Sequence, residues 1–427
     1  MLDLSRYVRP GDGVWWGQGG AEPEPLVNAL LDQAGAIGPV RAFSGLTWNE
    51  RLAGPLPANL TLLSYGGLGL LRKLSRRGGL EVVPCHYSSL PRMFARGLLP
   101  CDVGLLQVSA PDDDGLVSLG IGMEYVADAL RYTPTLIAEV NRQMPRTRGA
   151  SRLPLSAFAA TIETDRPLRE APAREADAAD RAIGELVATL IEDGDTVQIG
   201  VGTLPGAVLG ALSGHADLGF HTGMITDGVL DLVERGVATG AKKEIDQGLV
   251  ITGAAFGSAA MYGRLHEFPV EFRPASYTHD PAVLSRLRSL VSVNSAIEVD
   301  LLGQVGAELR GAVHIGAVGG QVDFSRAASL TGARSVIALR SEYFGGEYFG
   351  VEYGGEASGG RSAITATLAG GVVTTARSDV DAVVTEHGVA ALAGCTVAER
   401  ARRLVAVAAP HHREQLEASL ARPQAPA

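Results

Sequence analysis

The sequence predicts an α/β fold made of two related open domains, each built on a largely parallel sheet. Three observations support this prediction: a length of 427 residues, an internal repeat, and apolar strand-like runs that alternate with helical ones. A chain of this length exceeds what one hydrophobic core usually organises, so two domains are expected. The composition, with 46% hydrophobic and 20% charged residues, is that of a globular protein.

The internal repeat pairs residues 8–20 (VRPGDGVWWGQGG) with residues 191–203 (IEDGDTVQIGVGT). Both contain G-D-x-V-x-x-G-x-G, which predicts a turn, a short strand and a glycine-rich loop, and an amphipathic helix is predicted after each loop. We therefore expect an N-terminal domain over residues 1–175 and a C-terminal domain over residues 176–427, the latter carrying the active-site loops. The join is expected in the charged, proline-containing stretch 163–181.

Further elements are predicted from local patterns along the chain. Strands are expected in VGLLQVSA, PTLIAEV, GLVITGAAFG, SLVSVNSAIEVD, SVIALR and DAVVTEHG. The end of the joining stretch predicts a helix, because Ile183, Leu186, Val187 and Leu190 share one face. Nearly continuous apolar strands are typical of parallel sheets covered on both faces. Ligands of such folds gather at the C-terminal ends of strands, where the glycine-rich loops also fall.

Bulk properties narrow the classes of function. The net charge of −10 argues against a broad nucleic-acid surface but not against a small anionic ligand. Neither a signal peptide nor a membrane span is predicted, and three scattered cysteines fit a reducing cytoplasm. Without an H-E-x-x-H motif or a tight Cys/His cluster, no metal is expected.

Three stretches in the C-terminal half are candidates for a site. Glycine loops lie at Gly200–Val201–Gly202 and at residues 316–320 (GAVGG), and clustered glycines can point backbone amides at an anion or a developing oxyanion. The third stretch, FHTGMITDG at residues 220–228, places polar residues at a strand exit around Gly223, which has no side chain. Each glycine loop has the alternative interpretation of a tight turn.

Read together, several stretches resemble one known family. They occur in this order: QVSAPDDDGLVSLG, EVNRQMPRTRG, IGVGTLPGAVL, HTGMITDGVLDLVERG, YTHDP, VNSAIEVDLLGQV, AVGGQVDFSRAASL and VTTARSDVDAVVTEHGVA. This set resembles the acetyl-CoA hydrolase/transferase family, in the branch typified by 4-hydroxybutyrate CoA-transferase, and the resemblance extends to about residue 415. It implies a CoA-transferase-like fold with the active site between two α/β domains, acyl-CoA thioester substrates, and no metal.

The resemblance also implies a mechanism. In that family a glutamate carboxylate attacks the thioester, and the resulting enzyme-CoA thioester hands CoA to an incoming acid in a ping-pong cycle. The oxyanion hole is implied to come from the two glycine loops, Gly200–Gly202 and Ala317–Val318–Gly319–Gly320. The nucleophilic glutamate aligns with Gly223, so we expect the covalent route through that position to be absent, although His221 and its neighbours are retained.

Two further departures from the family pattern lie near the implied site. Ala317 stands where the family has the first glycine of a Gly-x-Gly-Gly loop. Residues 341–362 read SEYFGGEYFGVEYGGEASGGRS, where the family has Ser-Thr-Ala-Lys-Gly-Gly. This segment is interpreted either as a low-complexity surface loop or as a lid over the acyl group or acceptor. The lid residues would be Tyr343, Phe344, Tyr348 and Phe349.

The sequence therefore predicts an acyl transferase that uses acyl-CoA, or a related pantetheine thioester, without the usual glutamate. The acyl group would pass directly to a bound acceptor in a ternary complex, with Val201 and Ala317 donating backbone amides, His221 as general base, and the space at Gly223 admitting the acceptor. One alternative is a conventional CoA-transferase or acyl-CoA hydrolase with a surrogate glutamate, for which the candidates are Glu298 and the loop residues Glu342, Glu347 and Glu352. Another is a non-catalytic CoA-binding homologue.

The expected partners are small molecules: a thioester and an acyl acceptor, with no nucleic acid and no membrane. The family resemblance adds a possible homodimer in the cytoplasm. Replacement of the nucleophile would suit a specialised biosynthetic pathway.

Overall fold

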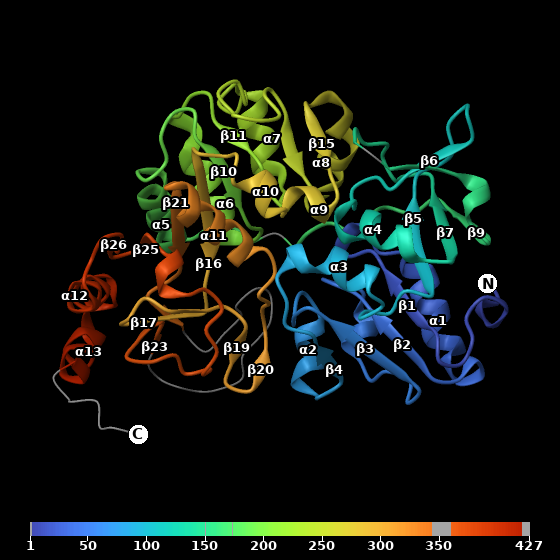
Figure 1. Ribbon diagram of the computed structural model, residues 1–427, viewed down its shortest axis with the longest axis horizontal. Coiled ribbons are helices and arrows are strands. Elements are labelled where there is room, and N and C mark those ends of the chain that lie inside the picture. The colour runs from blue at the N-terminus through green and yellow to red at the C-terminus, as the bar shows by residue number, and fades with distance from the viewer. Residues whose placement is uncertain (1, 150, 173, 344–359, 421–427) are drawn as a thin grey trace.

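The computed structural model describes residues 2–149, 151–172, 174–343 and 360–420 and confirms an α/β fold with largely parallel sheets. Figure 1 shows two lobes side by side, an N-terminal lobe in blue and cyan and a C-terminal lobe that runs from green to red. Each lobe is organised around a sheet of its own, built from strands that succeed one another along the chain.

The N-terminal lobe contains a sheet of seven parallel strands. In spatial order they are β4 (Leu80–Val82), β3 (Leu60–Ser64), β2 (Val40–Phe43), β1 (Gly13–Trp16), β5 (Val103–Val108), β7 (Thr135–Asn141) and β9 (Ala160–Thr164). Successive side chains of a strand point to opposite faces of the sheet, so neighbouring residues of β1 pack in two different hydrophobic clusters. Val14 and Trp16 pack in the cluster that includes α1, whereas Trp15 packs in the large cluster shared with the other lobe.

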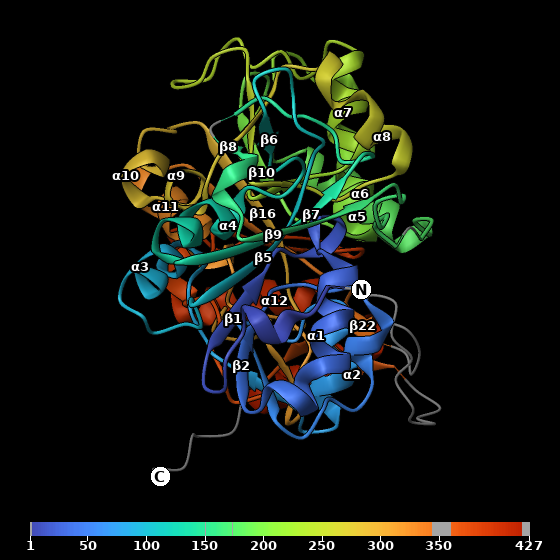
Figure 2. The ribbon, with the colours of Figure 1, turned by 90° about the vertical axis from the view of Figure 1, so that its right-hand side faces the viewer.

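Four α-helices accompany this first sheet: α1 (Glu24–Ile37), α2 (Leu71–Arg76), α3 (Leu90–Ala95) and α4 (Glu124–Ala129). Helix α1 begins with a proline in its first turn and ends at Gly38, whose φ of 103° an L side chain rarely adopts. Its buried residues, among them Leu26, Leu30 and Ala34, recur at helical spacing and face the sheet. Figure 2 shows α1 and α2 on the same side of β1 and β2.

The C-terminal lobe contains a six-stranded sheet that is parallel except for its last strand. In spatial order the strands are β11 (Gly219–Phe220), β10 (Thr196–Ile199), β16 (Leu290–Ser295), β21 (Arg334–Ala338), β25 (Ala382–Thr385) and β26 (Gly388–Ala391). Every residue of β10 and β25 is buried, as expected for strands covered on both faces. Short two- and three-stranded sheets surround this core.

Nine α-helices belong to the described part of the C-terminal lobe. They are α5 (Ala178–Ala188), α6 (Thr203–Ala211), α7 (Asp227–Glu234), α8 (Ala259–Arg264), α9 (Ala275–Thr278), α10 (Pro281–Leu284), α11 (Gln321–Thr331), α12 (Val397–Val407) and α13 (Arg413–Leu420). Helix α5 is the helix predicted after the joining stretch, and Asp177 and Asp180 form a capping box at its start. None of the helices described is long and apolar enough to cross a membrane.

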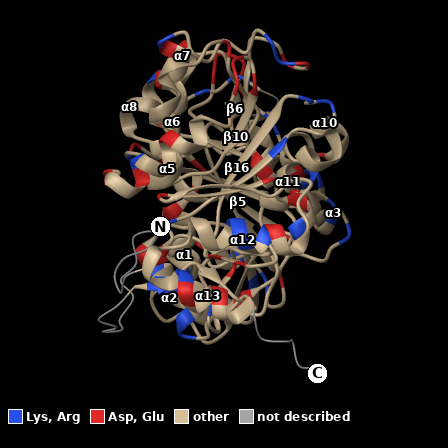
Figure 3. Ribbon diagram, turned by 90° about the vertical axis from the view of Figure 1, so that its left-hand side faces the viewer, with Lys and Arg blue, Asp and Glu red and all other residues tan. Residues whose placement is uncertain are grey.

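Both copies of the internal repeat form the predicted strand, glycine loop and helix. The first copy gives β1 and, after Gly19 and Gly20, α1; the second gives β10 and, after Gly202, α6. Charged residues lie mainly on the outer helices and loops, whereas the central strands β5, β10 and β16 contain none (Figure 3). The repeat therefore places a glycine-rich loop at the end of a buried strand in each lobe.

The lobes are joined by direct contacts at the second glycine loop, residues 316–320. The Tyr87 amide donates to the Gly319 carbonyl at 2.8 Å, and the Gly67 amide donates to the Gly316 carbonyl at 3.0 Å. Beside the loop, the Ser88 amide and hydroxyl donate to the Asp323 carboxylate at 3.0 and 2.6 Å. Residues of both lobes also share one hydrophobic cluster. The loop is therefore held between the lobes.

Candidate functional site

A cavity of about 190 Å³ lies where the two lobes meet. The C-terminal ends of β3, β10 and β16 lead into it, which is where parallel sheets usually bind ligands. The N-terminal lobe contributes Tyr65, Leu68, Tyr87 and Glu124. The C-terminal lobe contributes Gln198, Ile199, Gly200, Thr222, Gly223, Met224, His279, Asn294, Ala317, Val318, Gly319, Gly320, Gln321 and Phe324. The structure thus brings together the three stretches that the sequence singled out.

The two glycine loops lie on different sides of this cavity. Ala317, Val318, Gly319 and Gly320 line it directly, and Gly200 lines it from the first loop. Val201 and Gly202 instead line a second, larger cavity of about 690 Å³. Among the described residues, neither the Val201 amide nor the Ala317 amide has a hydrogen-bond acceptor. Both amides are therefore available to a ligand oxygen.

Gly202 has a backbone conformation that only glycine adopts without strain. Its φ is 120°, and it caps the N-terminus of α6. We expect Gly202→Ala to lower both turnover and the free energy of unfolding, the latter by about 1–3 kcal/mol, because the loop must shift to relieve the strain. Enzyme assays and thermal denaturation would measure the two effects. Gly35→Ala, at an exposed position of α1 where an added Cβ meets nothing within 4 Å, is the control. That control should leave turnover unchanged and not destabilise the protein.

The space beside Gly223 is filled by the imidazole ring of His279. A Cβ added at Gly223 would lie 2.9 Å from His279 Cε1 and 3.0 Å from Nε2, and a Cβ at Gly320 would lie 2.5 Å from the same nitrogen. The ring packs against Tyr87 at 4.6 Å and Phe324 at 5.0 Å, centroid to centroid. The sequence predicted an open space at Gly223 that would admit the acceptor. That prediction is wrong, because the His279 ring fills the space.

The Thr278 hydroxyl bears on the tautomer of His279. It lies 2.8 Å from His279 Nδ1 and 3.3 Å from the Pro274 carbonyl. When the hydroxyl donates to Pro274, Nδ1 is the donor to Thr278 and Nε2 carries the lone pair beside Gly223 and Gly320; the function proposed below uses this tautomer. Burial, with a smaller contribution from nearby His221, lowers the pKa of His279 to about 3, so the ring is neutral at physiological pH.

His221, the general base predicted from the sequence, does not line the cavity. Its side chain is fully buried, and Nε2 donates to the Thr278 carbonyl at 3.2 Å. Burial, with a smaller contribution from the nearby Lys243 ammonium, lowers its pKa to about 3. His221 therefore supports the backbone next to His279 and does not itself face the cavity. The sequence did show His279, but only within the YTHDP stretch that contributed to the family resemblance.

Glu124 is a cavity residue that the sequence analysis missed. It is 2% exposed and has a φ of 27°, a strained conformation for a residue with a side chain. The Tyr87 hydroxyl donates to its Oε2 at 2.7 Å, and Gln18 donates to the same oxygen. Burial raises the pKa of Glu124 to about 7, although these hydrogen bonds oppose the rise. Its amide donates to the Gly253 carbonyl, and the Gly253 amide donates to the Gly223 carbonyl.

The remaining predicted site residues lie elsewhere. Glu298, on β17 (Glu298–Asp300), accepts from the Ala369 and Gly370 amides, both at 3.0 Å, outside the cavity. Tyr343, on β22 (Glu342–Tyr343), donates to the Ala296 and Ile297 carbonyls and does not line the cavity. Glu347, Phe344, Tyr348 and Phe349 lie outside the described residues. The lid therefore stays a prediction.

The larger cavity adjoins the first glycine loop. It is lined by the first turns of α6 and α7, including Thr203 and Asp227, and by the segment around Pro172 and Arg174. Because Val201 and Gly202 separate it from the smaller cavity, a long ligand at this loop would meet both spaces. The free amides at the N-terminus of α6 favour an anionic or carbonyl group there.

Comparison with known proteins identifies the family. Residues 63–165 match the N-terminal domain of acetyl-CoA hydrolase/transferase, and residues 257–420 match its C-terminal domain. A 4-hydroxybutyrate coenzyme A transferase of Clostridium kluyveri is 39% identical over 82% of this chain and 79% of its own length. A butyryl-CoA:acetate CoA-transferase of Anaerostipes caccae is 31% identical over 96% of this chain and 93% of its own.

Solved structures agree with this result. RipA from Yersinia pestis superposes with a TM-score of 0.86 at 32% identity, covering 97% of this chain and 94% of that one. A 4-hydroxybutyrate CoA-transferase from Porphyromonas gingivalis superposes with a TM-score of 0.76 at 33% identity, covering 98% and 95%. With both domains matched in order and relatives aligned over nearly its whole length, the chain belongs to the acetyl-CoA hydrolase/transferase family.

Proposed function

We propose that this enzyme transfers the acyl group of an acyl-CoA, or a related pantetheine thioester, directly to a bound acceptor. One observation supports the proposal most strongly. Gly223, where the resemblance of the sequence places the family's glutamate, has no side chain, and the neutral imidazole of His279 occupies the space beside it. A base therefore stands where a nucleophile is expected. The acceptor class that needs a base is one with a proton to lose: an amine, an alcohol or water.

The proposed step needs no covalent enzyme intermediate. The acceptor attacks the thioester carbonyl while His279 Nε2 takes its proton, and the Ala317 amide, which borders the same cavity, stabilises the oxyanion. The Val201 amide, predicted from the sequence as a second donor, borders the larger cavity. The tetrahedral intermediate then collapses, the C–S bond breaks, and CoA leaves as a thiolate that receives the proton from the imidazolium. The low pKa of His279 keeps the lone pair free before attack. In the same proposal the pantetheine arm passes the first glycine loop into the larger cavity.

A second candidate function follows from the position of Glu124. It is a buried carboxylate in the cavity and is linked to Gly223 through Gly253, so it could serve as the surrogate nucleophile of a conventional CoA-transferase. Its Oε2 accepts two hydrogen bonds, whereas Oε1 has no hydrogen-bond partner among the described residues. At a pKa of about 7, roughly half of this carboxyl is ionised at neutral pH, so its protonation state does not decide between the two functions.

Covalent capture distinguishes the two functions. The enzyme is incubated with acyl-CoA, treated with hydroxylamine or borohydride, and digested for mass spectrometry. Direct transfer predicts no modified glutamate together with sequential kinetics, because both substrates must be bound at once. A modified Glu124 with ping-pong kinetics would instead establish the second function. Stabilisation by CoA without turnover of any thioester would identify a non-catalytic homologue.

The Glu124→Gln variant gives an independent prediction. If Glu124 is the nucleophile, the rate rises as pH increases through about 7, because only the ionised carboxylate attacks, and Glu124→Gln abolishes turnover. Direct transfer predicts that Glu124→Gln retains turnover within about tenfold, since glutamine fills the same space and loses only part of the contact with Tyr87. Initial rates from pH 5 to about 9, with CoA binding measured in parallel, check this prediction.

A further inference from the structure

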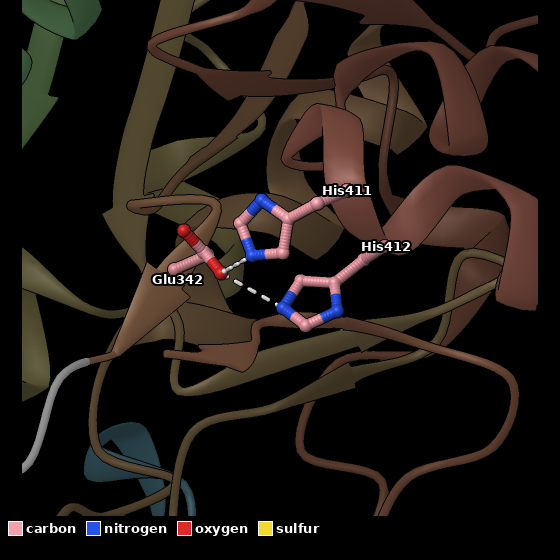
Figure 4. Close-up of side chains that lie close together, drawn as sticks. All are labelled: Glu342, His411 and His412. Atoms are coloured by element: carbon pink, nitrogen blue, oxygen red, sulfur yellow. Dashed lines mark ion pairs between the residues drawn. The ribbon is translucent and has the colours of Figure 1, made fainter. Parts of the chain in front are cut away.

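Glu342, His411 and His412 converge at a point outside both cavities. One oxygen of Glu342, Oε1, lies 2.6 Å from His411 Nε2 and 2.8 Å from His412 Nε2. Figure 4 shows both imidazole rings turning a nitrogen toward this oxygen. The three ligand atoms lie within 4.8 Å of one another.

The backbone on both sides holds this arrangement in place. Glu342 belongs to β22, which pairs with β23 (Arg361–Ser362) and so has a fixed position. The two histidines end a 3-10 turn, Pro410–His412, immediately before α13. Their ring centroids lie 4.3 Å apart, and each ring directs its Nε2 atom toward Glu342.

Hydrogen bonding does not account for the cluster. Glu342 Oε1 and His412 Nε2 are both buried, and neither has a hydrogen-bond partner of acceptable geometry among the described residues. A divalent cation would satisfy the carboxylate and the lone pairs of two neutral rings together.

We propose that Glu342, His411 and His412 bind a divalent transition-metal ion, with zinc the best match. Two imidazoles and one carboxylate form a set that Zn²⁺ uses in proteins, with water or another ligand completing a tetrahedron. Two ligands at about 2.0–2.1 Å from a tetrahedral Zn²⁺ lie about 3.3–3.4 Å apart, so the carboxylate oxygen must move away from the two ring nitrogens by about 0.5–0.8 Å. The bound ion would fasten the start of α13 to β22.

Metal binding tests the site without reference to turnover. The full chain is stripped with a chelator and titrated with Zn²⁺ alone by calorimetry, and with Co²⁺ for its visible absorption. We expect one ion per chain, tetrahedral Co²⁺ absorption, and a rise of a few degrees in the melting temperature with excess Zn²⁺. Failure of the wild-type chain to bind Zn²⁺ or Co²⁺ at micromolar concentration would overturn the assignment.

Matched variants locate the binding. Glu342→Gln and His412→Ala should each weaken Zn²⁺ binding by at least about tenfold, since each removes one of three protein ligands. The His411 side chain is 63% exposed, so His411→Ala is expected to fold. This variant therefore tests the site even if substitution of the more buried Glu342 or His412 prevents folding. The control is His266→Ala, an exposed histidine that also lies on a 3-10 helix, Leu265–Glu267. Equal Zn²⁺ affinity in the wild type and the His411→Ala variant would refute the site.

Discussion

Replacing His279 with alanine is expected to reduce turnover by about 10²–10⁴-fold, the usual contribution of a positioned general base. The effect should fall on kcat, because the imidazole acts on the acceptor proton and CoA binding depends on other groups. Steady-state kinetics and CoA titration measure the two quantities separately. Free imidazole should restore part of the rate, since the alanine leaves a ring-sized space between Tyr87 and Phe324. A purely structural role for His279 would not give this rescue.

Two controls accompany this variant. His266→Ala removes an exposed histidine remote from the cavity lining and should change neither kcat nor KM. His221→Ala removes the donor to the Thr278 carbonyl and should lower stability as well as turnover, without rescue by imidazole. A His279→Ala enzyme with more than about a third of the wild-type kcat would exclude His279 as the base.

The double variant Gly223→Glu/His279→Ala is expected to convert the enzyme to covalent chemistry. Glutamate at position 223 alone would begin within 3.0 Å of the His279 ring, so the single variant should lose stability and remain nearly inactive. Removing the ring opens the space for the new side chain. We then expect ping-pong kinetics with a carboxylic acid as acceptor and a modified Glu at position 223 after treatment with borohydride.

Gly223→Gln/His279→Ala is the matched control for this conversion. It has the same shape but no carboxylate, so it should form no covalent adduct. If the Gly223→Glu double variant folds, binds CoA and still forms no adduct, position 223 is not placed for attack on the thioester. The expectation that Gly223 takes the place of the family's nucleophile would then be wrong.

The architecture was predictable because its signals are local. Each copy of the repeat carries its own turn, strand and glycine loop, and β1 and β10 form where the two copies lie. Strands such as β5 and β25 are buried along their whole length, so their apolar runs identify them without knowledge of their neighbours.

The site was only partly predictable, because its decisive features depend on contacts between distant residues. Both glycine loops and Gly223 do line cavities at the meeting of the lobes. The position of His279 depends on how α9 ends and on packing against Tyr87 from the other lobe. The strained backbone of Glu124 depends on the Gly253 carbonyl. No local pattern contains either contact.

The expectation that no metal would be bound stays a prediction, and the metal site proposed above would contradict it. That expectation rested on the absence of closely spaced ligands. His411 and His412 are adjacent in sequence, but Glu342 joins them only because β22 lies beside the turn that precedes α13. The proposed ligands come from two segments that are far apart in the sequence, so no motif with a fixed spacing could reveal them.

The attachment of the 316–320 loop to the N-terminal lobe limits how substrates can enter. If the lobes swung apart like a clamshell, the bonds from Tyr87 and Gly67 would break and the cavity would lose Tyr65, Tyr87 and Glu124 from its lining. Because opening costs these contacts, we expect the thioester to enter the assembled pocket past loops or side chains. Neither half of the chain, expressed separately, should have any activity.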